Sequence, residues 1–124
     1  MKSTLIKFIV LTIACIILAT IFPATGFSSP DRIEILDTQM KVIKRYTDWT
    51  KCAWLVKLKN KTKEHLRLSI YIDYLDEQGF KIDDSWKSVT LNPDEEKVFS
   101  DTCPPFLNDV FSQIKSFNVI VKEN

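Results

Sequence analysis

The sequence predicts an all-β fold, an antiparallel β-sandwich of about seven strands. Two observations predict it. After residue 30, short runs in which apolar and polar residues alternate recur at a spacing of roughly ten residues, as half-buried strands do. In the same part of the chain no run with helical periodicity is long enough to cover a sheet, so a second sheet is the expected cover.

The first 26 residues differ in composition from the rest and precede the predicted sandwich. Lys2 and Lys7 flank the start of an uncharged, mostly apolar run at residues 8–22, and Pro23 with several small residues follows it. A positive start, a short apolar run and small residues after it are typical of a secretory signal peptide. We therefore expect residues 1–26 to be a signal peptide, cleaved after residue 26, and residues 27–124 to form the sandwich domain.

Two alternatives for this leader stay open. A membrane-spanning helix needs about 20 apolar residues, so residues 5–22 would anchor the chain only with Lys7 at the membrane surface. Lipid attachment to Cys15 is the weaker alternative, because the apolar run continues past the cysteine instead of ending there. We expect a secreted or periplasmic protein or, if the leader is uncleaved, one anchored by an N-terminal helix.

The predicted strands follow the alternation along the chain. Residues 52–60 and 66–75 each place apolar side chains on one face, so we expect them to pair as a hairpin across the polar turn between them. Residues 104–114 begin with two prolines and are expected to form an irregular loop with one helical turn. The predicted strands are residues 32–36, 41–46, 52–60, 66–75, 80–91, 96–101 and 116–121.

Turn residues between these strands carry a family resemblance. They are Asn60, Tyr74, Leu75, Asp76, Gly79 and Pro93. This pattern resembles the FxLYD-type immunoglobulin-like domains of bacterial cell-envelope proteins, although Val56 stands where that family often has a glycine. The resemblance implies an immunoglobulin-like sandwich of about seven strands, without known catalytic residues and with an accessory or interaction role.

Cys52 and Cys103 are the cysteines of the predicted exported domain. An even number of cysteines in an exported chain favours pairing, so we predict a structural disulfide. It would close a loop of about 50 residues and add up to roughly 4 kcal/mol of stability. The alternatives are two free thiols or a redox pair, although redox pairs usually lie in a Cys-x-x-Cys spacing.

Basic residues alternate along the predicted hairpin. Lys57 and Lys59 share its outward face, and Arg67 and Tyr71 on the partner strand are expected beside them. A basic and aromatic sheet face is a candidate binding surface for an envelope protein or an anionic polymer. The alternative is a solvated face on which lysines protect a strand edge from aggregation. Trp49, in a polar stretch, is a further aromatic residue that we expect to be exposed.

The remaining residues favour no enzyme class. A formal charge of +1 argues against nucleic-acid binding through bulk charge. The single histidine, His65, lies at a predicted turn without a nucleophile context, and the spacing of the acids Asp73, Asp76, Glu77, Asp83 and Asp84 fits no EF-hand loop. We therefore expect no catalytic residue, metal or cofactor, and membrane contact only through an uncleaved leader.

The leading hypothesis is an exported, non-catalytic, immunoglobulin-like binding or interaction module of the cell envelope. The alternative is a structural envelope or adhesion subunit that assembles through strand edges. A small metal-dependent hydrolase is the third hypothesis. The sequence predicts neither the partner nor the oligomeric state.

Overall fold

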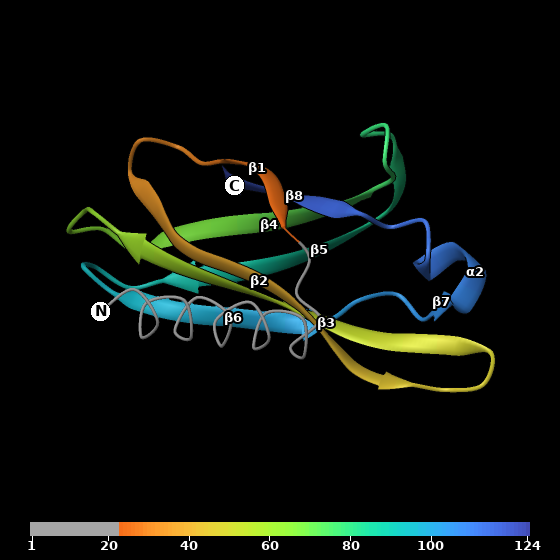
Figure 1. Cartoon of the computed structure of the whole chain (residues 1–124). Coiled ribbons are helices and arrows are strands. Elements are labelled where there is room, and N and C mark those ends of the chain that lie inside the picture. The colour runs from red at the N-terminus through yellow and green to blue at the C-terminus, as the bar shows by residue number, and fades with distance from the viewer. Residues whose placement is uncertain (1–22) are drawn as a thin grey trace, which may run out of the picture.

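The computed structural model describes residues 23–124 as two β-sheets packed face to face (Figure 1). One sheet contains, in spatial order, β1 (Ala24–Ser28), β8 (Ser116–Glu123), β4 (Leu66–Leu75) and β5 (Lys81–Leu91). The other contains β2 (Ile33–Arg45), β3 (Trp49–Asn60) and β6 (Glu96–Thr102), with the short β7 (Phe106–Leu107) paired to the start of β3. One helical turn, α2 (Asn108–Phe111), follows β7. The predicted all-β sandwich is confirmed.

The predicted leader lies largely outside the described residues. The expected signal or anchor helix and Cys15 fall within residues 1–22. The last leader residues, 24–26, belong to β1, which pairs in parallel with β8, so the predicted boundary after residue 26 falls inside this strand. The described part of the chain contains no helix that is long and apolar enough to cross a membrane.

The core lies between the sheets and follows the alternation that the sequence predicts. Every second residue of β3 is buried, and β4 buries the apolar face that faces it across the core. Because a strand turns successive side chains to opposite faces, these two patterns place one apolar layer on each side of the core. The inward residues of the two strands are Cys52, Trp54, Val56, Leu58, Leu66, Leu68, Ile70, Ile72 and Tyr74.

The predicted hairpin between β3 and β4 is wrong. β3 pairs with β2 and β6, whereas β4 pairs with β5 and β8 in the other sheet. The connection at residues 61–65 therefore crosses from one sheet to the other. Two further expectations are corrected: the predicted strands at 32–36 and 41–46 form one strand, β2, with two register irregularities, and β1 was not expected.

Asn60 holds the crossing connection in place. Its side chain is fully buried, and its Nδ2 donates to the carbonyl oxygens of Glu64 at 2.7 Å and Asn92 at 3.0 Å. Its Oδ1 accepts from the Thr62 N–H at 2.9 Å and from the Thr62 hydroxyl at 2.7 Å. These bonds satisfy the polar atoms of the buried Asn60 amide, so its burial leaves no unpaired donor or acceptor. They also join the β3–β4 connection to the β5–β6 turn.

The β4–β5 turn confirms the expected turn chemistry. Asp76 Oδ1 accepts from the backbone N–H groups of Gln78 and Phe80, each at 2.9 Å. Gly79 has a φ of 85°, a conformation that residues with a Cβ atom rarely adopt. In the β5–β6 turn, Asp94, which follows Pro93, is a non-glycine residue with a φ of 57°.

Candidate functional site

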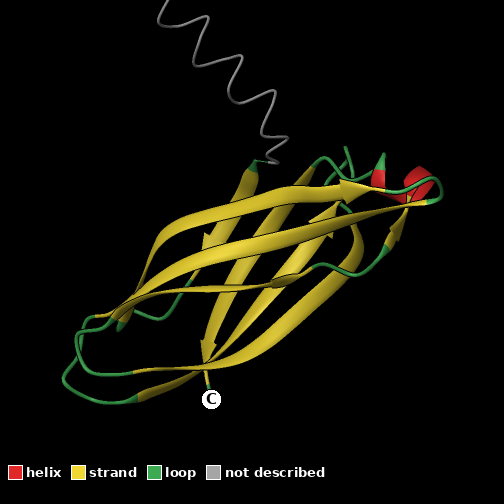
Figure 2. Ribbon diagram, turned by 90° about the horizontal axis from the view of Figure 1, so that it is seen from below, coloured by secondary structure: helices red, strands yellow, loops and turns green. Residues whose placement is uncertain are grey.

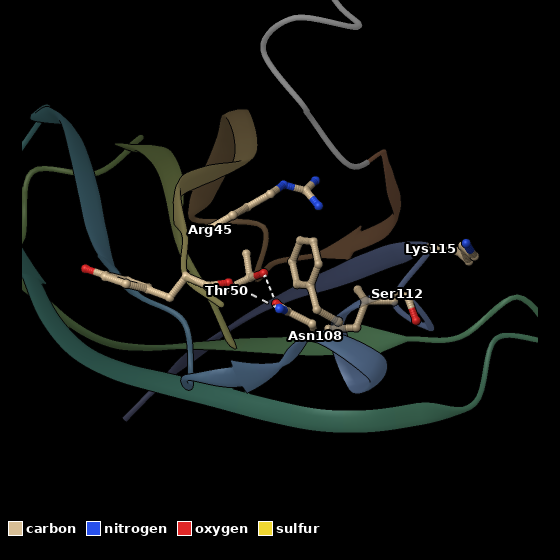
Figure 3. Close-up of a pocket in the computed structure, with 8 residues that line it drawn as sticks. Arg45, Thr50, Asn108, Ser112 and Lys115 are labelled. Carbon is tan, nitrogen blue, oxygen red and sulfur yellow. Dashed lines mark hydrogen bonds between the residues drawn. The ribbon is translucent and has the colours of Figure 1, made fainter. Parts of the chain in front are cut away.

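A pocket of about 700 Å³ lies at one end of the sandwich, where β2 and β4 end and β3 and β8 begin (Figure 3). Figure 2 shows the helical turn α2 at an end of the sandwich, outside the two sheets. A volume of this size is typical of pockets that hold small ligands. The residues that line it are Arg45, Tyr46, Thr50, Asn108, Phe111, Ser112, Ile114 and Lys115.

One wall of the pocket comes from the β2–β3 connection. The Tyr46 N–H donates to the Trp49 carbonyl at 2.8 Å and closes a tight turn. The rings of Tyr46 and Trp49 stack with their centroids 4.4 Å apart and their planes 13° from parallel. The Lys44 ammonium lies 5.0 Å from the centre of the Tyr46 ring. Stacking fixes the Tyr46 ring, which is partly exposed, at the edge of the pocket.

The opposite wall comes from α2, which a polar contact joins to β3. The buried Thr50 hydroxyl donates to Asn108 Oδ1 at 2.7 Å. The Asn108 Nδ2 donates in turn to the carbonyl oxygens of Thr47 at 3.0 Å and Tyr46 at 3.3 Å. The Asn108 N–H also donates to the Asp48 carbonyl at 3.1 Å. Asn108 thereby fixes α2 against the β2–β3 turn and sets the width of the pocket.

The floor of the pocket is apolar and its rim is cationic. Phe111 and Ile114 are buried, with 5% and 1% of their surface exposed. The Arg45 guanidinium lies 5.6 Å from the centre of the Phe111 ring, within the range of a cation–π contact. Lys115 is exposed, and its backbone N–H donates to the Leu75 carbonyl at 2.9 Å. Figure 3 shows Lys115 beyond Ser112, on the side of the pocket away from Thr50.

Neither cation at this rim is neutralised inside the described chain. The ion pairs among residues 23–124 involve other lysines and Arg32, and neither Arg45 nor Lys115 takes part in one. The residues that line the pocket include no carboxylate. The pocket therefore combines an apolar floor, hydroxyl and amide groups, and two unpaired positive charges, which suits an anion with an apolar body.

The structure divides the predicted binding surface between two sheets. Lys57 and Lys59 belong to β3, whereas Arg67 and Tyr71 belong to β4. Because β3 and β4 face each other across the core, their outward faces point in opposite directions. The expected continuous surface is thus wrong.

The charges of that predicted surface are also partly neutralised by neighbours. The ammonium groups of Lys57 and Lys59 lie 3.8 and 3.7 Å from the carboxylate of Glu96. Lys122 lies over the Tyr71 ring, 5.4 Å from its centre. Both arrangements are ordinary cross-strand contacts on a sheet face.

Cys52 and Cys103 meet at the edge of the core. Both are buried free thiols, and the Cys103 N–H donates to the Cys52 carbonyl at 2.9 Å. A hydrogen bond between the thiols and then burial raise the pKa of Cys52, and the same bond lowers the pKa of Cys103. Burial and then the Cys103 charge raise the pKa of the nearby Tyr74 phenol, which shares a 2.9 Å hydrogen bond with Ser85. The disulfide stays a prediction.

The other residues considered for chemistry do not line the pocket. His65 Nδ1 is 3.1 Å from Asn92 Oδ1 in an exposed turn. Asp76 accepts bonds from its own turn, and Asp84 pairs with Lys81 at 2.9 Å. Within residues 23–124 no three His, Cys, Asp or Glu side chains are grouped so as to hold a metal ion.

Sequence patterns did not identify the pocket. Its residues come from the junction of β2 and β3 at 45–50 and from the segment 108–115, and no alternation in the sequence indicates that these two segments meet. The one available signal was Trp49, an aromatic residue in a polar stretch. The structure places it half-buried against Tyr46 at the edge of the pocket.

No protein-family model matches this sequence, and no curated protein matches it. The fold is similar to that of cj0090 from Campylobacter jejuni, with a TM-score of 0.53 and 12% identity over 81% of this chain and 98% of that one. A DUF1425 family member from Shewanella sp. pv-4 aligns with a TM-score of 0.45 and 15% identity over 84% of this chain and 95% of that one. At this identity the likeness to cj0090 shows a shared small β-rich fold alone.

Proposed function

We propose that this chain is an exported, non-catalytic binding module of the cell envelope, and that it holds its ligand in the pocket between α2 and the β2–β3 turn. The observation that carries the proposal is the pocket itself. It has an apolar floor, a few polar groups and two unpaired cations. That composition is typical of a ligand-binding site.

The lining of the pocket supports binding rather than catalysis. Its residues include no imidazole, carboxylate or thiol, which are the groups most often used as general bases and nucleophiles. The pocket lining includes neither the buried thiols of Cys52 and Cys103 nor the exposed imidazole of His65. A module that recognises a ligand without transforming it needs none of these groups.

The composition of the leader and the family resemblance support the proposed envelope location. Residues 1–26 have the composition of a secretory leader or anchor. The turn residues Asn60, Asp76 and Gly79, which resemble those of FxLYD-type domains, make the bonds and the left-handed turn that such a pattern requires. We assign the chain to that type of envelope domain as part of the proposal.

A pocket-filling variant tests the proposed function. Ser112 is exposed and lines the pocket, so Ser112→Phe places a ring in the ligand's space. The control, Ser100→Phe, adds the same ring to an exposed position of β6. We expect the full chain, purified from its native envelope in a mild detergent, to carry a bound species in native mass spectrometry. The control should retain that species and Ser112→Phe should lose it.

Two results would count against the proposal. A wild-type chain that carries no ligand under these conditions contradicts binding in the pocket. A folded Ser112→Phe variant that carries as much ligand as Ser100→Phe places the ligand elsewhere. Circular dichroism of both variants identifies a loss that comes from misfolding, and in that case Ser112→Leu, with a smaller side chain, repeats the comparison.

A second candidate function, assembly through strand edges, is favoured by one observation. Among the described strands, β5 is an edge of its sheet, and its Trp86 side chain is 65% exposed. An exposed edge with a large apolar side chain can pair with another strand. Sedimentation of the full chain in detergent should then show concentration-dependent association that Trp86→Glu abolishes. A monomer at all concentrations excludes this candidate.

A further inference from the structure

The pocket and the junction with the leader lie at the same end of the sandwich. β1 begins at Ala24 and runs parallel to β8, with Ala24 opposite Phe117. The Phe117 N–H is bonded to the Pro23 carbonyl at 3.3 Å. Lys115, which lines the pocket, precedes Phe117 by two residues. The described chain therefore starts beside the pocket, directly after the apolar run at residues 8–22.

This placement determines which end of the sandwich lies at a membrane if the leader stays attached. An apolar run inserted in a bilayer brings the chain to the membrane surface at residue 23, and no long linker separates that residue from β1. The pocket end would then lie close to the lipid headgroups. Cationic residues near an anionic membrane surface each contribute favourably to binding there.

The charges at the pocket suit an anionic headgroup. Arg45 and Lys115 have no carboxylate partner within the described chain, and Arg45 lies over the buried Phe111 ring. A planar guanidinium and a compact ammonium are the two side chains that bind phosphate groups best. The Thr50 and Ser112 hydroxyls already donate to Asn108 Oδ1 and to the Asp109 carbonyl, so the two cations are the groups that would bind the headgroup.

No carboxylate of the segments beside the pocket forms an ion pair with Arg45 or Lys115 in the described structure. Asp109 Oδ1 accepts from the Val110 N–H at 2.9 Å. Asp76 and Glu77 line a separate hollow that shares Ser112 and Lys115 with the pocket, and Asp76 is bonded to its own turn. No ion pair joins either residue to Lys115 in the described structure.

We propose that the pocket binds the phosphate-bearing headgroup of an anionic phospholipid, with the apolar floor receiving the first carbons of the lipid. This proposal rests on the proposed function and adds the ligand class and the source. With the leader still attached, the domain would be held against the membrane at two points, the leader and the pocket. Two attachments give an orientation that one flexible attachment does not.

The test uses the full chain in micelles of a non-ionic detergent. Its probes are dihexanoyl phosphatidylglycerol, dihexanoyl phosphatidylcholine and inorganic phosphate, titrated separately and followed by amide chemical shifts. We expect the phosphatidylglycerol to bind saturably, with shifts at residues 45–50 and 108–115. The zwitterionic lipid and free phosphate should bind more weakly by on the order of tenfold or more.

Matched charge variants identify the site. The variant Arg45→Gln/Lys115→Gln should weaken phosphatidylglycerol binding by on the order of tenfold or more. The control Lys61→Gln/Lys97→Gln removes the same charge from exposed positions near the far end of β3 and should leave binding unchanged. The charge-conserving Lys115→Arg should also bind normally. If the double variant misfolds, Lys115→Gln alone must still weaken binding.

Each contrary result overturns the proposal. If phosphatidylcholine binds as tightly as phosphatidylglycerol, the negative charge of the headgroup does not determine binding. If free phosphate binds as tightly as phosphatidylglycerol, the ligand need not be a lipid. Equal loss in the Lys61→Gln/Lys97→Gln control would indicate a general charge effect. A native ligand that Ser112→Phe displaces but that contains no phosphate would sustain the proposed function and refute this inference.

Discussion

The Thr50 hydroxyl donates to Asn108 Oδ1 at 2.7 Å and joins the start of β3 to α2 in the wall of the pocket. Thr50 is 1% exposed, so this hydroxyl has little access to water. The bond connects residues 58 positions apart in the sequence and brings together the two segments that line the pocket.

Removing this bond should loosen the pocket. In Asn108→Ala the buried Thr50 hydroxyl loses its partner, and we expect a destabilisation of about 1–3 kcal/mol. Thr50→Val removes the hydroxyl with little change in shape. A double-mutant cycle by urea unfolding should give a coupling energy of about 1 kcal/mol between the two positions. Additive effects of the two substitutions would show that the bond contributes no stability.

The alternation in the sequence predicts the strands and their buried faces because it depends on local geometry alone. β4 was expected at residues 66–75, and β3 at 52–60 differs only in its earlier start. The turn at Asp76 and Gly79 was also predictable, since its bonds and its positive φ are made within five residues.

Strand pairing was not predictable from alternation. An apolar face indicates which side is buried but not which strand supplies the hydrogen bonds. The alternation in β3 and β4 is compatible with a hairpin and also with a position in two opposite sheets. The structure has the second arrangement, in which the buried Asn60 donates to the Asn92 carbonyl. The pocket was not predictable for the same reason, because contacts such as Thr50–Asn108 join elements that lie far apart in the sequence.

Asn60 should be among the polar residues whose loss costs most stability. Asn60→Ala leaves the carbonyls of Glu64 and Asn92 without their amide donor in a buried position, and we expect a loss of about 3 kcal/mol. The control Gln113→Ala truncates an exposed amide and should change stability little. Thermal or urea unfolding compares the two variants. Similar midpoints would show that the Asn60 bonds do not stabilise the crossing connection.

The proposed export predicts that Cys52 and Cys103 become oxidised. The two residues are neighbours, since the Cys103 N–H donates to the Cys52 carbonyl at 2.9 Å, and an oxidising compartment favours the disulfide. Mass measurement of the native protein should show the loss of two hydrogens, and reduction should lower stability by up to roughly 4 kcal/mol. Cys15→Ala removes the third cysteine as a control. Quantitative alkylation of both thiols without reductant would contradict the prediction.

Tyr74 should make the fold sensitive to alkali. Burial raises the pKa of its phenol, so the folded state keeps a proton that the unfolded state loses above about pH 10. The stabilisation that the protonated Tyr74 phenol provides is therefore fully present below about pH 10 and decreases above it. Tyr74→Phe loses the bond to Ser85 at neutral pH, yet its melting temperature should fall less between pH 8 and pH 11, roughly. An equal fall in both proteins would assign the effect to other groups.

The central claim is that the ligand lies in the pocket, and photo-crosslinking in the native envelope tests it most directly. A benzoylphenylalanine in place of Tyr46 keeps an aromatic ring at the pocket edge, and the same residue in place of Tyr71 labels the outward face of β4, part of the surface that the sequence predicted. Both tyrosines are similarly exposed, at 38% and 36%, so access to the reagent is matched. The pocket account predicts a crosslinked product from position 46 and none from position 71. A product from position 71 alone would contradict it.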